Sequence, residues 1–195
     1  MAKRGPYEKG EAKRREILRV ALEVFAEEGY RGTSLRKVAA RCNLSLPGLM
    51  HYFASKEDML TQVLRARDEA GRAHMEAYTG PDPHTESIRE GARTPGLVEL
   101  FVSMAAAGGD PEHPAHAFFA ERYPQFRARL TGVFEELAAA GALDGVPVPP
   151  ERLAVLMLAV ADGIQLQWLN DRSIDMEQPV KDLMALLGVA AARRP

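Results

Sequence analysis

The 195-residue sequence predicts an all-α protein of about nine helices. Almost every apolar segment repeats with the 3.6-residue period of a helix, and few segments are rich in β-branched residues. Breaks that contain proline and glycine, such as "ARTPG", "GGDPEHP" and "GALDGVPVPP", divide the chain into segments of helical length. With 46% hydrophobic and 27% charged residues, the chain can bury a core and lacks the composition of a disordered protein.

Charge is distributed unevenly along the chain. Residues 1–56 contain twelve Lys and Arg against six Asp and Glu, a net charge of +6, whereas the remaining residues carry a net charge of −8. Such a basic segment on an acidic body indicates that only the N-terminal part meets a polyanion. We therefore expect two domains, residues 1–56 and 57–195.

The first predicted helix covers about residues 9–28. Its apolar stripe consists of Ile17, Leu18, Ala21, Leu22 and Phe25. Gly29 follows, where a residue with positive φ would end the helix. A short second helix begins after Thr33 or Ser34, either of which can cap it. Asn43 then supplies a turn, because asparagine tolerates positive φ better than most residues.

Residues 45–53 read "SLPGLMHYF" and place proline beside glycine in an otherwise helical stretch. If Ser45 is the N-cap of a third helix, Pro47 and Gly48 lie in its first turn, where the N–H groups have no helical acceptor and proline is tolerated. Gly48 would also remove bulk from a leading edge that another surface could approach. The pair therefore marks the start of a short helix at residues 46–52.

A fourth helix begins after Ser55, which forms a capping box with Asp58 and leads a segment that ends near Tyr78. Further helices are expected at residues 84–92, 95–107, 113–140, 150–171 and 177–191.

Two short helices joined by a tight turn, behind a longer helix and in a basic segment, form a helix-turn-helix. The stretch "TSLRKVAARCNLSLPGLMHYFASKEDML" resembles the N-terminal DNA-binding domain of the tetracycline-repressor (TetR) family. The matching positions are Thr33, Ser34, Val38, Ala39, Ser45, Leu49, Tyr52, Phe53 and Lys56. Beyond residue 60 the chain is similar to actinobacterial members in the number and length of its helices. Two positions depart from the family pattern: Asn43 replaces the usual turn glycine, and Met50 replaces a tyrosine whose hydroxyl would bind phosphate.

The resemblance implies that the third helix enters the major groove of DNA. The residues expected to contact DNA are Thr33, Ser34, Arg36, Ser45, Leu46, Pro47, Gly48, His51, Tyr52 and Lys56. Lys56 is poorly placed for its own helix, because it lies at the positive end of the helix dipole, and this favours a phosphate partner. The segment "LPGLMHY" contains no Arg, Lys, Asn or Gln, the side chains that make bidentate base contacts. We therefore predict that selectivity comes largely from Arg36, backbone geometry and DNA shape.

The segment 150–171 is apolar on two faces, which indicates burial on both sides and, in a small chain, contact with a second subunit. The resemblance implies a four-helix homodimer interface formed by the last two long helices. The residues assigned to it are Leu153, Met157, Val160, Ile164, Val180, Leu183, Met184 and Leu187. Dimerisation would set two third helices ~34–36 Å apart, the spacing of successive major grooves.

The helices between residues 60 and 140 would enclose an effector pocket, as the resemblance implies. Its expected ligand-binding residues are Phe101, Met104, His116, Phe119, Tyr123, Gln165 and Trp168, with Phe118 and Phe126 as further wall residues. Each of these residues also fits a plain role in the core. An apolar or aromatic, weakly polar effector fits this set.

Several classes of protein are not supported by the sequence. The single cysteine, Cys42, excludes an intrachain disulfide, and no nucleophile or glycine-rich phosphate loop points to an enzyme. His113 and His116 are separated by Pro114 and lack a completing acid cluster, so we predict no metal and no cofactor. The longest uncharged apolar run, Leu153 to Ala161, is too short to span a bilayer, and no secretory signal is visible. We expect a cytoplasmic protein that has no membrane partner.

Two functions remain open at this point. The first is a homodimeric transcriptional repressor that binds a palindromic operator in double-stranded DNA and is released by a small apolar effector. The second is a helical small-molecule-binding or enzymatic protein that retains the helix-turn-helix only as a scaffold. The basic N-terminal segment and Lys56 favour the first.

Overall fold

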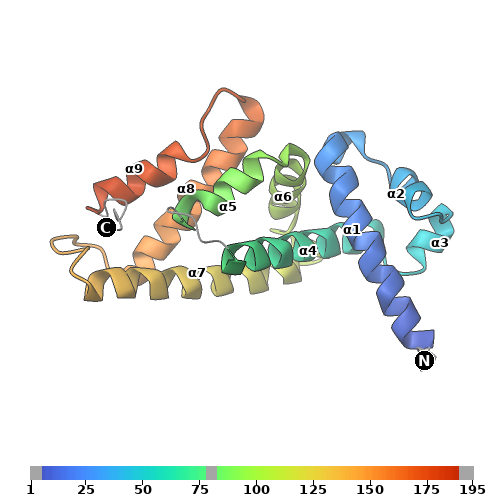
Figure 1. Ribbon diagram of the computed structural model, residues 1–195, viewed down its shortest axis with the longest axis horizontal. Coiled ribbons are helices and arrows are strands. Elements are labelled where there is room, and N and C mark those ends of the chain that lie inside the picture. Colours follow the sequence, from blue (N-terminus) through green and yellow to red (C-terminus); the bar gives the residue numbers. More distant parts are fainter. Residues whose placement is uncertain (1–5, 78–82, 189–195) are drawn as a thin grey trace. The chain divides into compact units, whose positions relative to one another are not determined.

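The computed structural model describes residues 6–77 and 83–188, and all regular secondary structure in these two ranges is helical (Figure 1). The helices are α1 (Pro6–Gly32), α2 (Leu35–Arg41), α3 (Leu46–Met50), α4 (Lys56–Ala77), α5 (Pro83–Ala92), α6 (Pro95–Ala107), α7 (Ala115–Ala139), α8 (Pro150–Asn170) and α9 (Gln178–Leu186). The predicted all-α fold is confirmed.

The first of two compact units comprises Met1–Ala73 and Thr94–Phe118. Helix α1 packs against both α2 and α6, and α2 packs against α3. The predicted stripe of α1 supplies part of the core, since Ile17, Ala21 and Phe25 are buried. This unit extends beyond residue 56 and includes α6, which packs on α1. The predicted domain boundary after residue 56 stays a prediction.

The second unit comprises His74–Arg93 and Phe119–Pro195. Helix α9 packs against α8 and α5. The buried residues of its core are Phe134, Leu143, Leu153, Ala154, Met157, Val180 and Met184. A loop that contains two glycines with positive φ, Gly141 and Gly145, connects α7 to α8.

Three predicted helix ends are wrong, and α3 ends at Met50 rather than at residue 52. Helix α1 continues through Gly29 to Gly32, so Gly29 stays helical at a cost of about 1 kcal/mol relative to alanine. The last helix ends at Leu186 rather than at residue 191, because Gly188 adopts a φ of 77°. Residues 189–191 of that prediction lie outside the described residues.

Helix α8 is the one described helix that is long and apolar enough to cross a membrane, with a mean hydropathy of 1.3. A search for an uncharged run overlooks it because Asp162 interrupts the apolar sequence. Core helices of soluble proteins meet the same criteria, and α8 buries Leu153 and Met157 in the second unit. This single helix is therefore weak evidence for a membrane span.

Candidate nucleic-acid interface

Helices α2 and α3 each begin at a serine whose side chain caps the helix. Ser34 Oγ accepts a hydrogen bond from the N–H of Lys37 at 3.3 Å, and Ser45 Oγ accepts one from the N–H of Gly48 at 3.1 Å. Both serines have the extended backbone of an N-cap. The predicted cap at Ser45 is confirmed, and Ser34 is the residue that caps α2.

Thr33, the alternative cap of α2, has a different role, because its hydroxyl donates to the carbonyl of Val24 on α1 at 3.4 Å. The predicted turn at Asn43 is confirmed, since Asn43 is the one non-glycine residue with positive φ in the described chain, at 54°. The N–H of Leu44 donates to the carbonyl of Ala39 at 2.9 Å. This bond stabilises the turn between α2 and α3, directly before the N-cap of α3.

Pro47 and Gly48 lie in the first turn of α3, as predicted. Gly48 also has a reason within the chain, because an added Cβ would lie 3.2 Å from Ser45 Oγ. A larger side chain at this position would therefore crowd the hydroxyl that caps the helix. Glycine here preserves the cap, in addition to leaving the leading edge of α3 open.

A single side chain anchors α3 to the unit. Leu49 is completely buried, whereas the other four residues of the helix are exposed or partly exposed. Phe53 follows the helix and is also buried, and the guanidinium of Arg14 lies 5.4 Å from the centre of its ring. His51 is exposed, and its ring meets that of Tyr52 edge-on at 6.0 Å. Most of the surface of α3 is therefore available to a partner.

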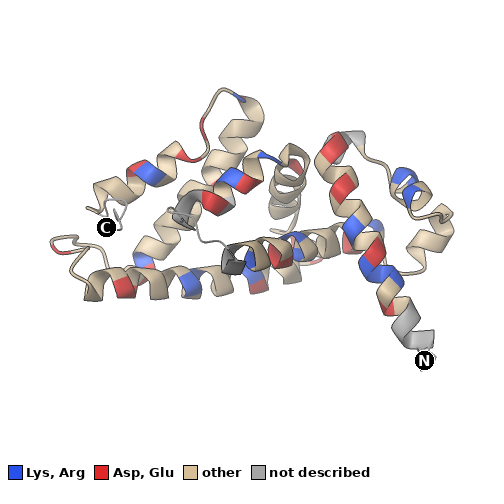
Figure 2. Ribbon diagram, viewed as in Figure 1, with Lys and Arg blue, Asp and Glu red and all other residues tan. Residues whose placement is uncertain are grey.

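Several basic residues near α3 are paired within the unit. Lys37 bonds to Glu28, and Arg41 bonds to Glu27 at 2.6 Å, so two cations of α2 pair with carboxylates of α1. Figure 2 shows basic positions on α2 and acidic positions on α1. The hydrogen bond from Arg41 lowers the pKa of Glu27. Lys13 donates to Glu16 at 2.8 Å and to the carbonyl of Cys42 at 3.1 Å, at the end of α2. These contacts leave fewer unpaired cations for a partner than the number of Lys and Arg residues suggests.

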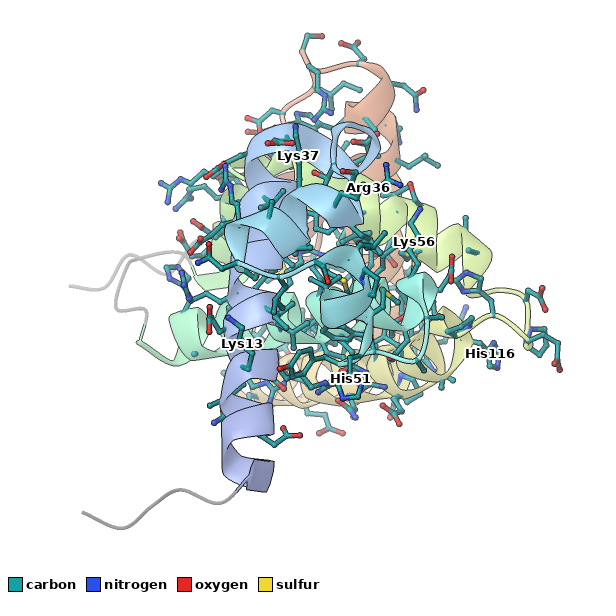
Figure 3. The ribbon with its side chains drawn as sticks, turned by 90° about the vertical axis from the view of Figure 1, so that its right-hand side faces the viewer. Lys13, Arg36, Lys37, His51, Lys56 and His116 are labelled. Atoms are coloured by element: carbon teal, nitrogen blue, oxygen red, sulfur yellow. The ribbon has the colours of Figure 1, made fainter. Side chains whose placement is uncertain are left out.

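Arg36 and Lys56 differ from these paired cations. Both are exposed, and neither has an ion pair among the described residues. In the view of Figure 3 they project on one side of α3, and His51 projects on the other. Helix α3 itself carries no charge (Figure 2). An uncharged helix flanked by available cations suits a groove bordered by phosphates.

The start of α4 fixes the position of Lys56. Ser55 Oγ accepts the N–H of Asp58 at 3.0 Å, and Asp58 Oδ2 accepts the N–H of Ala54 at 2.9 Å. The predicted capping box is confirmed, with the reciprocal bond shifted by one residue to Ala54. Lys56 is therefore held at the first position of a capped helix.

The residues predicted to bind a ligand fall in both units. In the first unit Phe101 and Met104 are buried on α6, and the ring of His116 donates from Nδ1 to the carbonyl of Gly108 at 2.9 Å. His113 Nδ1 accepts the N–H of Ala115 at 3.1 Å. Both histidine rings therefore form hydrogen bonds with the backbone near the start of α7.

In the second unit, Phe119 and Tyr123 form a ring pair at 5.9 Å. The hydroxyl of Tyr123 donates to Asp162 Oδ2 at 2.8 Å, and burial raises the pKa of Tyr123 to about 12, with a further contribution from the Asp162 charge. Gln165 and Trp168, the other two predicted ligand residues, follow Asp162 at intervals of three residues and are both buried. The structure thus places Tyr123 against the helix that carries Gln165.

Seven of the eight residues assigned to a dimer interface lie in or against the core of the second unit, and the eighth, Ile164, is buried on α8 outside that core. Leu153, Met157, Val180 and Met184 belong to the core, and Val160, Leu183 and Leu187 are partly buried against it. The opposite face of α8 is exposed, with Val155 at 50%, Leu156 at 46% and Leu166 at 53%. Leu186 on α9 is 84% exposed. We call Val155 and Leu166, which lie on one side of α8, the apolar face.

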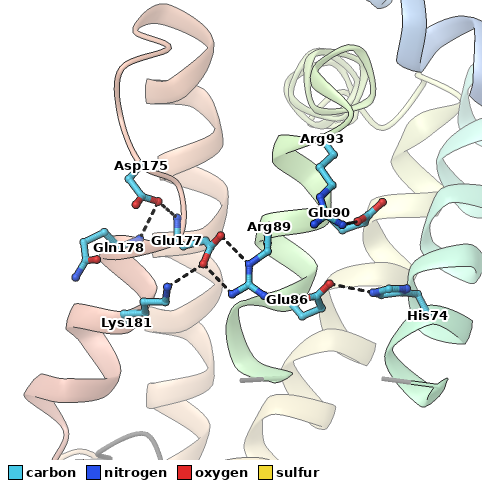
Figure 4. Close-up of polar contacts among 9 residues, drawn as sticks. All are labelled: His74, Glu86, Arg89, Glu90, Arg93, Asp175, Glu177, Gln178 and Lys181. Carbon is cyan, nitrogen blue, oxygen red and sulfur yellow. Dashed lines mark hydrogen bonds and ion pairs between the residues drawn. The ribbon is translucent and has the colours of Figure 1, made fainter. Parts of the chain in front are cut away.

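A polar network in the second unit was not predicted from the sequence. The buried carboxylate of Glu86 bonds to His74 at 3.1 Å and to Arg89 at 2.7 Å (Figure 4). Arg89 forms a two-point pair with Glu177, which also binds Lys181. These hydrogen bonds, first that of Arg89 and then that of Lys181, lower the pKa of Glu177 to about 2.

One part of this network has the spacing of a metal site. His74, Glu86 and Glu90 offer three ligand atoms within 4.8 Å of one another. The guanidinium of Arg89 already neutralises Glu86, so we assign the cluster to the network. The short spacing between Glu86 and Arg89 is visible in the sequence, but the partner at position 177 lies 88 residues away.

Comparison with known proteins finds a family match for the helix-turn-helix segment. Residues 17–63 match the model of bacterial regulatory proteins of the tetR family. The chain is 28% identical over 107 residues to the HTH-type transcriptional repressor KstR2 of Rhodococcus jostii, a match that covers 55% of this chain and 48% of that protein. It is 33% identical over 79 residues to the HTH-type transcriptional regulator RutR of Escherichia coli K12, covering 40% and 37% respectively. The chain thus matches less than half the length of either relative.

Solved structures resemble the whole fold. A TetR-family transcriptional regulator from Rhodococcus sp. has a TM-score of 0.67 at 20% identity, covering 93% of this chain and all of that one. Thermus thermophilus FadR in complex with lauroyl-CoA has a TM-score of 0.56 at 21% identity, covering 93% and 97%. AibR in complex with isovaleryl coenzyme A and operator DNA has a TM-score of 0.51 at 22% identity, covering 91% and 98%. At these identities the likeness shows the fold alone.

Proposed function

We propose that this chain, a TetR-family protein through residues 17–63, is a transcriptional repressor that binds operator DNA and releases it when a small effector binds. Helix α3 carries the proposal. It is capped by Ser45, anchored by Leu49 and otherwise open to a partner, within the segment that matches the family. The action on DNA would take place in the cytoplasm.

Recognition of DNA by this interface would depend on phosphate contacts more than on base contacts. Arg36 and Lys56 are the available cations beside α3, and the N–H groups at the starts of α2 and α3 can face an anion. Because α3 lacks side chains for bidentate base contacts, Arg36 and the shape of the duplex would supply most of the selectivity.

We propose that the protein is a homodimer formed through the apolar face. Val155 and Leu166 lie eleven residues, about three turns, apart on α8, and their side chains remain half exposed in the single chain. Four of the residues assigned from the sequence, Leu153, Met157, Val180 and Met184, lie in the core of the second unit, which leaves the exposed side of α8 to a partner. A second copy would cover the apolar face and place two α3 helices on one palindrome.

An apolar effector is proposed for the helices beyond α3. FadR and AibR, whose folds resemble this one, are solved with acyl-coenzyme A molecules, and AibR also with operator DNA. A ligand can release DNA only by binding more tightly to the conformation with low DNA affinity. The residues predicted to bind the effector include Tyr123, Gln165 and Trp168.

Selection of bound duplexes from a random DNA pool tests this function. We expect a palindromic sequence, bound by one or more dimers, with an affinity that falls steeply as salt is added. The log–log slope should be near −0.9 for each phosphate contact. Recovery of no preferred sequence, and no binding at low salt, would instead support the helical binding protein or enzyme that retains the motif as a scaffold.

A further inference from the structure

Gln165 has a buried hydrogen-bond acceptor whose partner is not found in the described chain. The side chain is 9% exposed, and its Oε1 atom has no hydrogen-bond partner there. Its Nε2 atom donates to the carbonyl of Ala161, one turn earlier on α8, at 2.9 Å. A buried polar atom without a partner is unfavourable, so such atoms in native proteins usually have a role.

The orientation of this amide follows from its neighbour. The Ala161 carbonyl can only accept a hydrogen bond, so the amide nitrogen of Gln165 must face it. If the amide were flipped, its oxygen would face the Ala161 carbonyl oxygen, and two acceptors would repel each other. The unpartnered atom of Gln165 is therefore the oxygen. A ligand group that donates a hydrogen bond can pair with this oxygen, whereas a ligand carbonyl or carboxylate oxygen would be repelled by it.

The residues around Gln165 narrow the chemistry further. Asp162 and Trp168 lie three residues before and after it, on adjacent turns of the same side of α8. Asp162 accepts the hydroxyl of Tyr123, and the raised pKa of Tyr123 keeps that hydroxyl protonated at neutral pH. The Trp168 ring, buried and with the guanidinium of Arg172 at 3.7 Å from its centre, gives this side of α8 an aromatic character.

We propose that Gln165 Oε1 accepts a hydrogen bond from a neutral hydroxyl or amide N–H of the effector, whose apolar or aromatic body packs beside Trp168. This inference rests on the proposed function, because it specifies the chemistry of the effector that controls DNA binding. A neutral donor completes the buried acceptor. The same site would disfavour a ligand that presents only acceptors at this point.

A matched series of probes tests the donor requirement. Para-butylphenol carries a hydroxyl donor, para-butylanisole replaces it with a methyl ether, and para-butylbenzoate replaces it with an anion. Trp168 is the only tryptophan in the chain, so its emission reports binding beside Gln165. We expect the phenol to bind roughly tenfold more tightly than the anisole, since the anisole leaves the acceptor unpaired. The benzoate should bind more weakly than the phenol.

Variants then assign the preference to Gln165. In Gln165→Leu the acceptor is gone, and the phenol and the anisole should bind equally. Gln165→Met, which keeps an unbranched side chain, serves the same purpose if leucine disturbs folding as judged by circular dichroism. Gln125→Leu is the matched control, because Gln125 is exposed on α7 and should leave the preference intact.

Three results would overturn the inference: binding of none of the probes, preference for the anisole or the benzoate, or a phenol preference that persists in the Gln165 variants. Operator binding by the unaltered protein is measured in parallel. If operator binding is intact while the phenol preference is absent, this inference fails and the proposed function stands. If no operator is bound, the proposed function fails.

Discussion

Helices α3 and α8 carry the two parts of the proposed function, and they differ in how their surfaces are used. Helix α3 has five residues, of which Leu49 alone is buried, and its start is set by Ser45 and Asn43 directly before it. Helix α8 has 21 residues, buries one apolar face in its own unit and leaves Val155 and Leu166 exposed. The first helix is positioned by local contacts, whereas the second is defined by what packs against each of its faces.

This difference determines which features can be altered separately. Around α3, caps, an anchor and cations are distinct residues with distinct neighbours. On α8, core residues and the proposed interface share one helix, so substitutions there are expected to affect both features together.

The largest effect is expected from the anchor of α3. Leu49→Ala should lower the free energy of unfolding by about 2–5 kcal/mol, since a fully buried leucine is removed, and should abolish DNA binding. Leu49→Met, which nearly conserves volume, should cost less than about 1.5 kcal/mol. Urea denaturation and a DNA-binding titration measure both. Retained DNA binding in Leu49→Ala would contradict the view that one side chain positions α3.

The apolar face of α8 is expected to show the next largest effect. Glutamate at both Val155 and Leu166 should weaken dimerisation by at least about a hundredfold, because each charge would be buried without a partner at the interface. Sedimentation velocity at several concentrations measures the change. The control, Gln125→Glu, adds charge to an exposed position on α7. An unchanged dimer in the double variant would place the interface elsewhere.

The network at Glu177 predicts how the second unit responds to acid. The pKa of Glu177 is lowered from 4.5 to about 2, first by Arg89 and then by Lys181. The ionised Glu177 therefore stabilises the folded state fully above pH 4.5, and this stabilisation is lost as pH falls towards about 2. Glu177→Gln should cost about 2 kcal/mol at neutral pH, after allowance for partial exposure, and should flatten this part of the profile. Urea denaturation across that pH range tests it, with the exposed Glu135→Gln as control. Parallel profiles for both variants would refute the role of Glu177.

The smallest expected effects distinguish free from paired cations around α3. Arg36→Ala and Lys56→Ala should each reduce the log–log salt slope of DNA binding by about 0.9 per lost phosphate contact, hence about 1.8 per dimer. Lys37→Ala and Arg41→Ala are matched controls, because carboxylates of α1 already pair with these side chains. They should change the slope less. Equal changes in all four variants would show that net charge, rather than the available cations, determines affinity.

The sequence by itself determined the local features of this protein. The caps at Ser45 and Ser55, the turn at Asn43 and most helix bounds follow from residues a few positions apart, and the structure agrees with them. The match to the family lies in the same short-range pattern. A cap or a turn depends on hydrogen bonds that close within one helical turn, so neighbouring residues suffice to predict it.

Only the tertiary structure decided which similar residues take different roles. The composition of α2 does not separate Arg36 from Lys37 or Arg41; carboxylates of α1 do. The two apolar stripes of α8 have similar patterns, yet one is core and the other exposed. The pairing of Arg89 with Glu177 spans 88 residues. Burial and ion pairing depend on segments that are distant in sequence, and a periodic pattern states that a face is apolar without stating what will cover it.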